Sequence, residues 1–206
     1  MHGVSCYAKG LKEETNRYFL NGLEFCEGMN LPGWNAIGLL SLGESYFEMG
    51  DFQRAKEYFE KGTLALMRGR ILPSWAGFGK VCVARAKLMN KEMEVNLESL
   101  YDQSKNNRIK AAEGWIHRHI GEILLNIDDQ HISEAEHWIQ SAIEADQRNR
   151  MMFHLGNDYP LYADLFRRKG DRSKAQENLG KAIEILKECG ADGWVKKYEE
   201  EMTKLA

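Results

Sequence analysis

The sequence has few of the residues and runs on which redox, metal-binding and membrane proteins depend. Only four cysteines occur, and no two of them form a Cys-x-x-Cys pair, so neither a redox pair nor a zinc knuckle is indicated. No run of about 18 apolar residues occurs, so no membrane-spanning helix is expected. Residues 1–30 lack the apolar core of a signal peptide, and acidic residues begin at Glu13. We therefore expect a cytoplasmic protein with reduced thiols.

Neither sign of charge is in excess. The formal net charge is −3, and residues 1–100 carry 12 basic and 12 acidic residues against 16 and 19 in the remainder. A protein that binds a phosphate backbone needs a basic stripe or face. The sequence therefore predicts no nucleic-acid partner and, without a spanning helix, no membrane partner.

Motifs of catalysis and of metal binding are also missing. Gly77-Phe78-Gly79-Lys80 lacks the spacing of a phosphate-binding loop, and no Ser or Thr follows it. His117 and His119 are two residues apart in an expected helix, so they point to different sides, and no His-Glu-x-x-His occurs. No Gly-x-Ser-x-Gly sequence is present. We predict no catalytic residue, no metal site and no cofactor, and we expect that the protein is not an enzyme.

Proline is scarce as well, since only three occur, while Ala, Leu, Glu and Lys are common, which favours an all-α protein. One pattern recurs three times. Each copy has a small residue in a first helix, a large apolar residue three positions later, a polar turn, and a small residue near the start of a second helix. The copies are Gly43, Tyr46 and Ala55; Gly121, Leu124 and Ala135; and Ala163, Phe166 and Ala175. Such a helix pair cannot bury its apolar face alone, so the copies are expected to stack into a solenoid.

The small residues of the first helices need a packing explanation. Glycine in a helix interior costs about 1 kcal/mol relative to alanine. Gly43 and Gly121 at the same place in two copies therefore predict close approach of the paired helix, which a Cβ would prevent. The interval between them (121 − 43 = 78) is twice the roughly 40 residues of a helical repeat. A degenerate copy is therefore expected between them, with its second helix starting near Glu94.

We predict one domain over residues 1–206. An N-terminal half-pair and a C-terminal capping helix flank four helix pairs. The expected ranges are 10–28 for the half-pair, 34–68, 74–104, 109–145 and 159–189 for the pairs, and 192–205 for the cap. In the cap, Trp194, Tyr198 and Met202 share one side, as expected of a helix with one face on the stack and one in water.

The spacing of small and aromatic residues resembles the tetratricopeptide repeat (TPR) over roughly residues 34–190. The matching residues are Leu42, Gly43, Tyr46, Ala55 and Phe59; Ile120, Gly121, Leu124 and Ala135; and Tyr162, Ala163, Phe166, Ala175 and Ala182. The resemblance implies a right-handed superhelix of stacked antiparallel helix pairs, with a concave groove that presents a surface to peptides or helices.

The last third is similar to TPR segments at the C-termini of bacterial multidomain signalling proteins. The stretches that carry this similarity are 114–122, the Asp128-Asp129 insertion, 133–136 and 182–192. In those proteins a class III nucleotide cyclase domain, or another output domain, is joined to a predicted ATPase and a TPR region. Neither of the other parts is in this sequence, which leaves open whether the chain is a fragment or a stand-alone relative.

The family lines its groove with the first helix of each repeat. The candidate groove residues are Leu40, Glu44 and Phe47; Trp115, Arg118 and Glu122; and Asp164, Arg167 and Arg168. Trp115 is included because it falls at a groove position near Arg118, and the others are carried over by position. Trp115 beside Arg118 is a candidate peptide anchor, because Trp and Arg are enriched at binding hot spots. Family members that grip chaperone C-terminal carboxylates have Lys and Asn at set groove positions. Those positions hold Leu40, Glu44, Arg118 and Glu122 here, so a heat-shock chaperone tail is not an expected partner.

The function predicted from these features is a non-catalytic scaffold that binds a protein or peptide of unknown identity in its groove. The alternative is a domain that senses a small ligand and controls an attached nucleotide cyclase or ATPase. A thermal shift with a metabolite and no peptide would favour that alternative. The sequence leaves open whether the chain forms a homo-oligomer.

Overall fold

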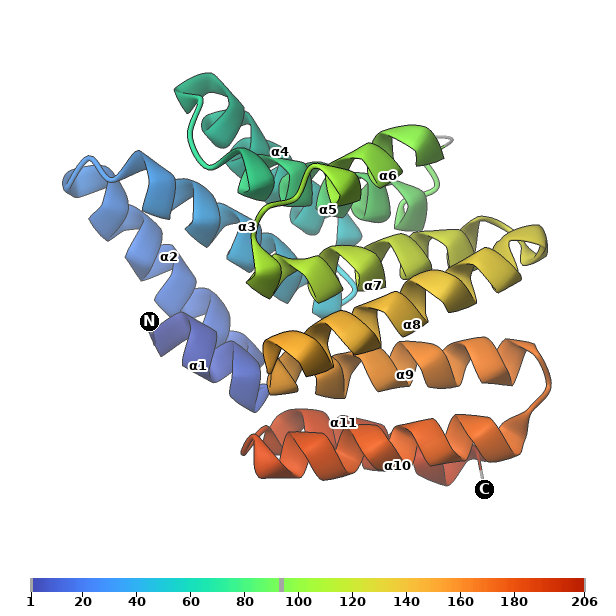
Figure 1. The fold of residues 1–206 in the computed structure, drawn as a ribbon. Coiled ribbons are helices and arrows are strands. Elements are labelled where there is room, and N and C mark those ends of the chain that lie inside the picture. Colours follow the sequence, from blue (N-terminus) through green and yellow to red (C-terminus); the bar gives the residue numbers. More distant parts are fainter. Residues whose placement is uncertain (1, 93–94, 206) are drawn as a thin grey trace. The chain divides into compact units, whose positions relative to one another are not determined.

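The computed structural model describes residues 2–92 and 95–205, and within them it contains helices and no β-strand (Figure 1). The helices of the first half are α1 His2–Lys9, α2 Lys12–Gly28, α3 Pro32–Glu48, α4 Phe52–Gly69, α5 Pro73–Met89 and α6 Leu97–Lys105. Those of the second half are α7 Lys110–Ile127, α8 Ile132–Asn149, α9 Met152–Arg168, α10 Arg172–Glu188 and α11 Asp192–Leu205, with the short 3-10 turn η1 Asp129–His131 before α8. Among the described residues, no helix combines the length and the apolar character that crossing a bilayer requires.

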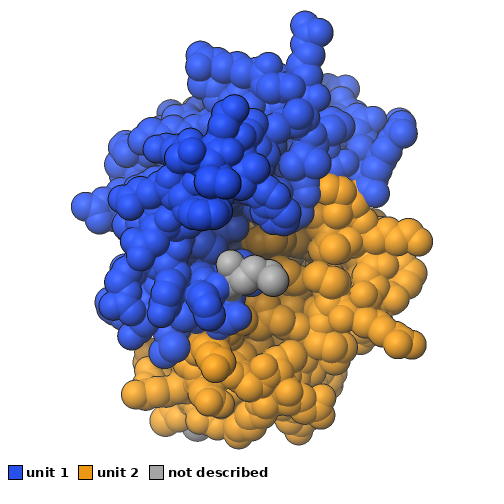
Figure 2. Space-filling view, turned by 90° about the vertical axis from the view of Figure 1, so that its left-hand side faces the viewer, with its two compact units in different colours: residues 1–7, 11–108 blue, residues 8–10, 109–206 orange. Residues whose placement is uncertain are grey.

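The chain divides into two compact units, which Figure 2 shows in different colours. Unit 1 comprises residues 1–7 and 11–108, and unit 2 comprises residues 8–10 and 109–206. Within unit 1, α3 packs against α2 and α4, and α4 packs against α5. Within unit 2, α8 packs against α7 and α9, and α10 packs against α9 and α11. The single continuous domain expected from the sequence stays a prediction.

A Gly-Asp turn precedes the second helix in two of the helix pairs, α3–α4 and α9–α10. Asp51 and Asp171 precede α4 and α10, and each carboxylate accepts a hydrogen bond from a backbone N–H three residues later, at 3.1 and 3.0 Å. This bond satisfies one of the free N–H groups at a helix start. Gly50 and Gly170 before them have φ of +79° and +77°, a backbone region that favours glycine. The recurring Gly-Asp therefore both ends one helix and starts the next.

The predicted reason for the small residues is confirmed at two positions. A Cβ added to Gly43 would lie 2.5 Å from the Phe59 ring of α4, and one added to Gly121 would lie 2.8 Å from Ile139 of α8. Phe59 and Ile139 are fully buried, so neither side chain has room to retreat. The glycines therefore let the two helices of a pair approach each other closely, and their cost in helix propensity is offset by that contact.

The chain departs from the expected ranges in two places. Helix α1 was not expected, and the left-handed Gly10, with φ of +77°, separates it from α2, which begins at Lys12 rather than at residue 10. Helix α9 begins at Met152 rather than at residue 159, and Pro160 lies inside it. The turn before Pro160 stays helical because Leu155 is buried and Gly156 allows Leu186 of α10 to pack on the backbone. Glu94, the expected start of a second helix, lies outside the described residues.

Candidate interaction site

Three of the predicted groove residues lie in the interior of unit 1. Leu40, Glu44 and Phe47, all on α3, are only 1%, 2% and 6% exposed. The positions that the family resemblance assigned to an open groove are therefore packed inside the protein here. We do not retain these three as candidate contacts.

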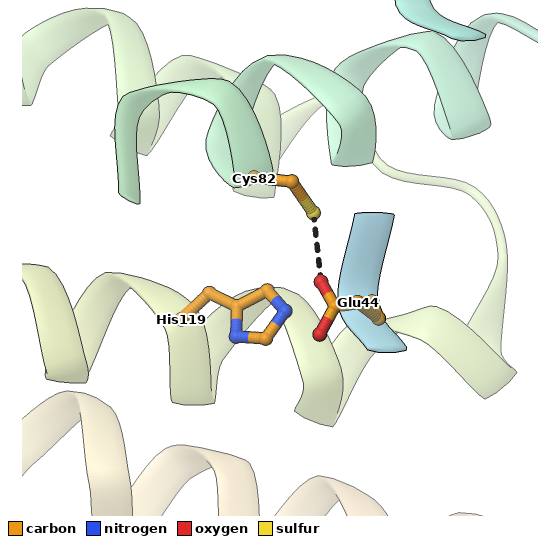
Figure 3. Close-up of side chains that lie close together, drawn as sticks. All are labelled: Glu44, Cys82 and His119. Atoms are coloured by element: carbon orange, nitrogen blue, oxygen red, sulfur yellow. Dashed lines mark hydrogen bonds between the residues drawn. The ribbon is translucent and has the colours of Figure 1, made fainter. Parts of the chain in front are cut away.

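Glu44 belongs instead to a buried polar network between α3 and α5. Arg85 Nη1 lies 3.1 Å from Glu44 Oε2, and the thiol of Cys82 donates to Glu44 Oε1 at 3.3 Å (Figure 3). The Arg85 guanidinium also lies 3.5 Å from the centre of the Phe47 ring, which is cation–π geometry. Buried charges are tolerated when they are paired in this way, so this network is structural.

Two further predicted residues, Trp115 and Arg118 on α7, lie in or beside the core of unit 2. Arg118 is 9% exposed, its Nη1 lies 3.6 Å from Asp158 Oδ1, and it donates to the carbonyl of His154 at 3.4 Å. The Trp115 ring is half-buried and packs on the His154 ring, with 4.7 Å between the centroids. Arg118 therefore compensates a buried acid on α9, and we do not retain it as a groove contact.

Sequence reasoning missed a pair of buried acids, Asp146 on α8 and Asp158 on α9. Both are 0% exposed, and among the described residues no group outside the pair donates a hydrogen bond to their carboxylate oxygens. Gly114 of α7 makes the room, since a Cβ there would lie 2.2 Å from Asp146 Oδ1. One signal was present: Asp146 follows Ala135, Ile139 and Ala142 on the buried stripe of its helix, where an acid is out of place.

Burial changes the protonation of this pair. It raises the pKa of Asp146 to about 6, although the guanidinium of Arg118 opposes the rise. Burial also raises the pKa of Asp158 well above its ordinary value, with Arg118 again opposing and the Asp146 carboxylate adding to the rise. Two acids this close disfavour ionising together, so the pair keeps a proton at pH values where exposed aspartates have none.

The remaining predicted residues meet at one open cavity of about 720 Å³, here named the unit 2 cavity. It is lined by four helices of unit 2. Glu122 and Asn126 come from α7; Pro160, Leu161, Ala163, Asp164, Arg167 and Arg168 from α9; Arg172 and Leu179 from α10; and Glu201, Lys204 and Leu205 from α11. Four of the nine predicted groove residues, Glu122, Asp164, Arg167 and Arg168, therefore share a single concave surface.

The wall of the unit 2 cavity on α9 is held by a network around Asp164. Arg168 Nε lies 3.0 Å from Asp164 Oδ2, and Arg167 pairs with the other oxygen of the same carboxylate. Arg168 also donates to the side chain of Asn126 at 2.9 Å and to the carbonyl of Leu125. Arg168 is thus fixed in place, whereas the Arg167 side chain is 63% exposed and available to a ligand.

Unit 1 carries a second hollow of different chemistry, here named the unit 1 pocket, of about 560 Å³ between α1, α2 and α3. None of the described residues that line it is Asp, Glu, Lys or Arg. Its residues are His2, Gly3, Val4, Ser5, Tyr18, Phe19, Gly22, Leu23, Phe25, Cys26, Leu31, Trp34, Ile37, Gly38 and Ser41. Phe25 and Trp34 at its edge are 62% and 68% exposed, which is unusual for large aromatic side chains.

Comparison with known proteins supports the fold. The tetratricopeptide repeat matches residues 37–64, which fall within α3 and α4. The crystal structure of BtubC (BKLC) from P. vanneervenii is similar with a TM-score of 0.58 and 13% sequence identity, over 94% of this chain and 90% of that one. At that identity the likeness concerns the fold alone, an all-α TPR-like helical repeat. No curated protein matches the sequence.

Proposed function

We propose that this protein is a non-catalytic interaction module that binds a polypeptide at the unit 2 cavity. The observation that carries the proposal is the cavity itself, which brings Glu122, Asp164, Arg167 and Arg168 together from two helices. Its volume of about 720 Å³ lies in the range of ligand sites in proteins. The helical-repeat fold and the tetratricopeptide match add support, because such repeats present extended surfaces to partners.

The test begins with capture of partners by the full chain, identified by mass spectrometry. Affinity for the captured partner is then compared between the wild type and Arg167→Ala. We expect a loss of about fivefold or more, as for a contact at a binding hot spot. The matched control is Arg148→Ala, since Arg148 is also an exposed arginine of unit 2 in an ion pair, 2.7 Å from Glu113, and lies outside the cavity. Equal affinities for the two variants would remove the cavity from the proposal.

The unit 1 pocket favours a second candidate, a small-ligand-sensing regulatory domain. A pocket of about 560 Å³ with apolar walls and a few polar groups suits a small apolar ligand. A screen of apolar metabolites by thermal shift tests this reading, because a ligand that binds only the folded state raises its melting temperature. Gly22→Leu should abolish any such shift, because position 22 lines the pocket and a Cβ there would meet nothing within 4 Å, so the larger side chain can occupy the pocket without a clash. A shift that survives the substitution would place the ligand elsewhere.

Three finer points stay predictions from the sequence: a cytoplasmic location, a role in bacterial signalling, and control of an attached nucleotide cyclase or ATPase. The location rests on the lack of a signal-peptide core and of a long apolar run, and the other two points rest on the similarity of the last third to signalling proteins. The proposal of polypeptide binding depends on none of the three.

A further inference from the structure

We infer that the segment bound in the unit 2 cavity is acidic, with carboxylate side chains flanking an aliphatic one. This inference rests on the proposed function and adds the chemistry of the partner. Four basic side chains and three acidic ones line the cavity. The basic residues are Arg167, Arg168, Arg172 and Lys204, and the acidic residues are Glu122, Asp164 and Glu201.

The charges in the cavity are not evenly compensated. Asp164 is engaged by both Arg167 and Arg168, so its charge is already neutralised within α9. Arg172 and Lys204 are both exposed. Within the described residues, no carboxylate lies within 4 Å of the Arg172 guanidinium or of the Lys204 ammonium group. Positive groups without an acid beside them raise the local concentration of anionic ligands. Glu122 and Glu201 offset part of this charge, so the cavity has a net excess of one positive charge (4 − 3 = 1), and its cations without a neighbouring acid are Arg172 and Lys204.

These two residues come from different elements, α10 and α11. Their side chains meet at one cavity because α11 packs on α10. Arginine can take a carboxylate with two parallel hydrogen bonds, and lysine supplies a point charge. A segment that lies along the cavity can therefore meet Arg172 and Lys204 with separate carboxylates.

Apolar groups complete the surface. Leu161, Leu179 and Leu205 also line the cavity, and Leu179 is almost fully buried. An aliphatic side chain that packs on these leucines would be removed from water, and this burial of apolar surface stabilises a complex. Salt does not screen this hydrophobic contribution. The arrangement thus fits an acid–aliphatic–acid pattern better than a purely charged ligand such as a nucleic-acid backbone.

The experiment measures binding of the full chain to labelled decapeptide pools with random flanks, by fluorescence polarisation at low salt. One pool has a fixed central Glu-Leu-Glu, a second has Gln-Leu-Gln, and a third has Lys-Leu-Lys. We expect the Glu-Leu-Glu pool to bind at least about tenfold more tightly than the Gln-Leu-Gln pool, with a preference that falls as salt is added. A single-stranded oligonucleotide of similar length should bind more weakly than the acidic pool.

Charge reversal locates the effect. Arg172→Glu with Lys204→Glu should remove the preference for the acidic pool. The matched control is Arg150→Glu with Lys196→Glu, which changes the net charge equally at two exposed residues of unit 2 outside the cavity and should keep the preference.

The outcomes separate the two levels of the proposal. Equal binding of the Glu and Gln pools, tighter binding of the Lys pool or of the oligonucleotide, or equal loss in both charge-reversed proteins would overturn the acidic partner. If the Gln or Lys pool binds and Arg167→Ala weakens it, polypeptide binding at the cavity stands without the acidic preference. If none of the three pools binds, the cavity is not a polypeptide site.

Discussion

The two units both bury an arginine against carboxylates, but the geometry and the charge balance differ. In unit 1, Arg85 lies 3.1 Å from Glu44 and 3.8 Å from Glu48, which is partly exposed. In unit 2, Arg118 lies 3.6 Å from Asp158, and a second buried acid, Asp146, packs beside that carboxylate with a raised pKa of about 6.

The two units differ in how they can keep their buried charges neutralised when one charged partner is lost. A buried ion pair in close contact depends on both partners, since removing one leaves an uncompensated charge in the core. A buried pair of acids has another route to neutrality, because a proton can replace a missing countercharge. Unit 1 should therefore be sensitive to substitution at this network, and unit 2 should be sensitive to pH.

The largest expected effect tests unit 1. Arg85→Leu should lower the free energy of unfolding by about 3–5 kcal/mol, because it leaves the Glu44 carboxylate buried without its guanidinium. Urea unfolding of the full chain measures the loss. Adding Glu44→Leu to the same chain should recover most of it, since an apolar pair of similar volume replaces the ion pair. A loss below about 1 kcal/mol in the single variant would mean that Glu44 is not held as a buried charge.

The second expected effect tests unit 2. The pKa of Asp146 is about 6 in the folded protein, against about 3.9 in an unfolded chain. The folded state therefore holds its proton more tightly, and the stability this proton provides is fully present below about pH 4 and is lost as the pH rises through about 6. This rise in the pKa of Asp146 corresponds to roughly 3 kcal/mol in the free energy of unfolding. The part of it that is lost above about pH 5 is readily measured.

Urea unfolding from about pH 5 to 8 shows whether stability falls in this way. Asp146→Asn should flatten the profile, because an amide needs no proton to stay neutral beside Asp158. Asp129→Asn, at an exposed aspartate of the same unit, is the control and should keep the slope. A wild-type profile that rises over this range would contradict the raised pKa of the buried pair.

The close contacts of the repeats could be predicted from the sequence, whereas the meeting of the two buried acids could not, although the position of Asp146 on the buried stripe of its helix indicates burial. Gly43 and Gly121 were informative because a glycine in a helix is costly and both recur at the same position, so the close contact with the next helix was predictable. Asp146 and Asp158 are 12 positions apart and lie on different helices. Nothing in their spacing shows that packing brings them together over Gly114.

The candidate site was only half predictable for a related reason. Assigning groove positions by repeat assumes that the same face of each first helix is open. In unit 1 that assumption was wrong for Glu44, because α5 covers it with Cys82 and Arg85. In the last repeat the face stays open, but two of its charges, Arg172 and Lys204, come from the second helix and the cap, where the family pattern places no groove residue.

A smaller effect tests the glycines that both units share. Gly43→Ala and Gly121→Ala should each destabilise the protein by about 1–3 kcal/mol, because the new Cβ would meet the buried side chain of Phe59 or Ile139. Similar losses in the two variants would show that both units use the same packing device. A neutral result at either position would mean that the helices of that pair can move apart at little cost.

The smallest expected effect has the opposite sign. Gly22 on α2 and Gly180 on α10 are also helical, but a Cβ at Gly22 would meet nothing within 4 Å, and one at Gly180 would only reach Met202 Cε at 4.0 Å. Alanine should therefore stabilise each unit by about 0.5–1 kcal/mol through helix propensity alone. The measurement is the urea midpoint of each variant beside Gly43→Ala and Gly121→Ala. A loss at Gly22 but a gain at Gly180 would mean that the unit 1 pocket, which Gly22 lines, closes in solution, and it would also weaken the small-ligand candidate for unit 1.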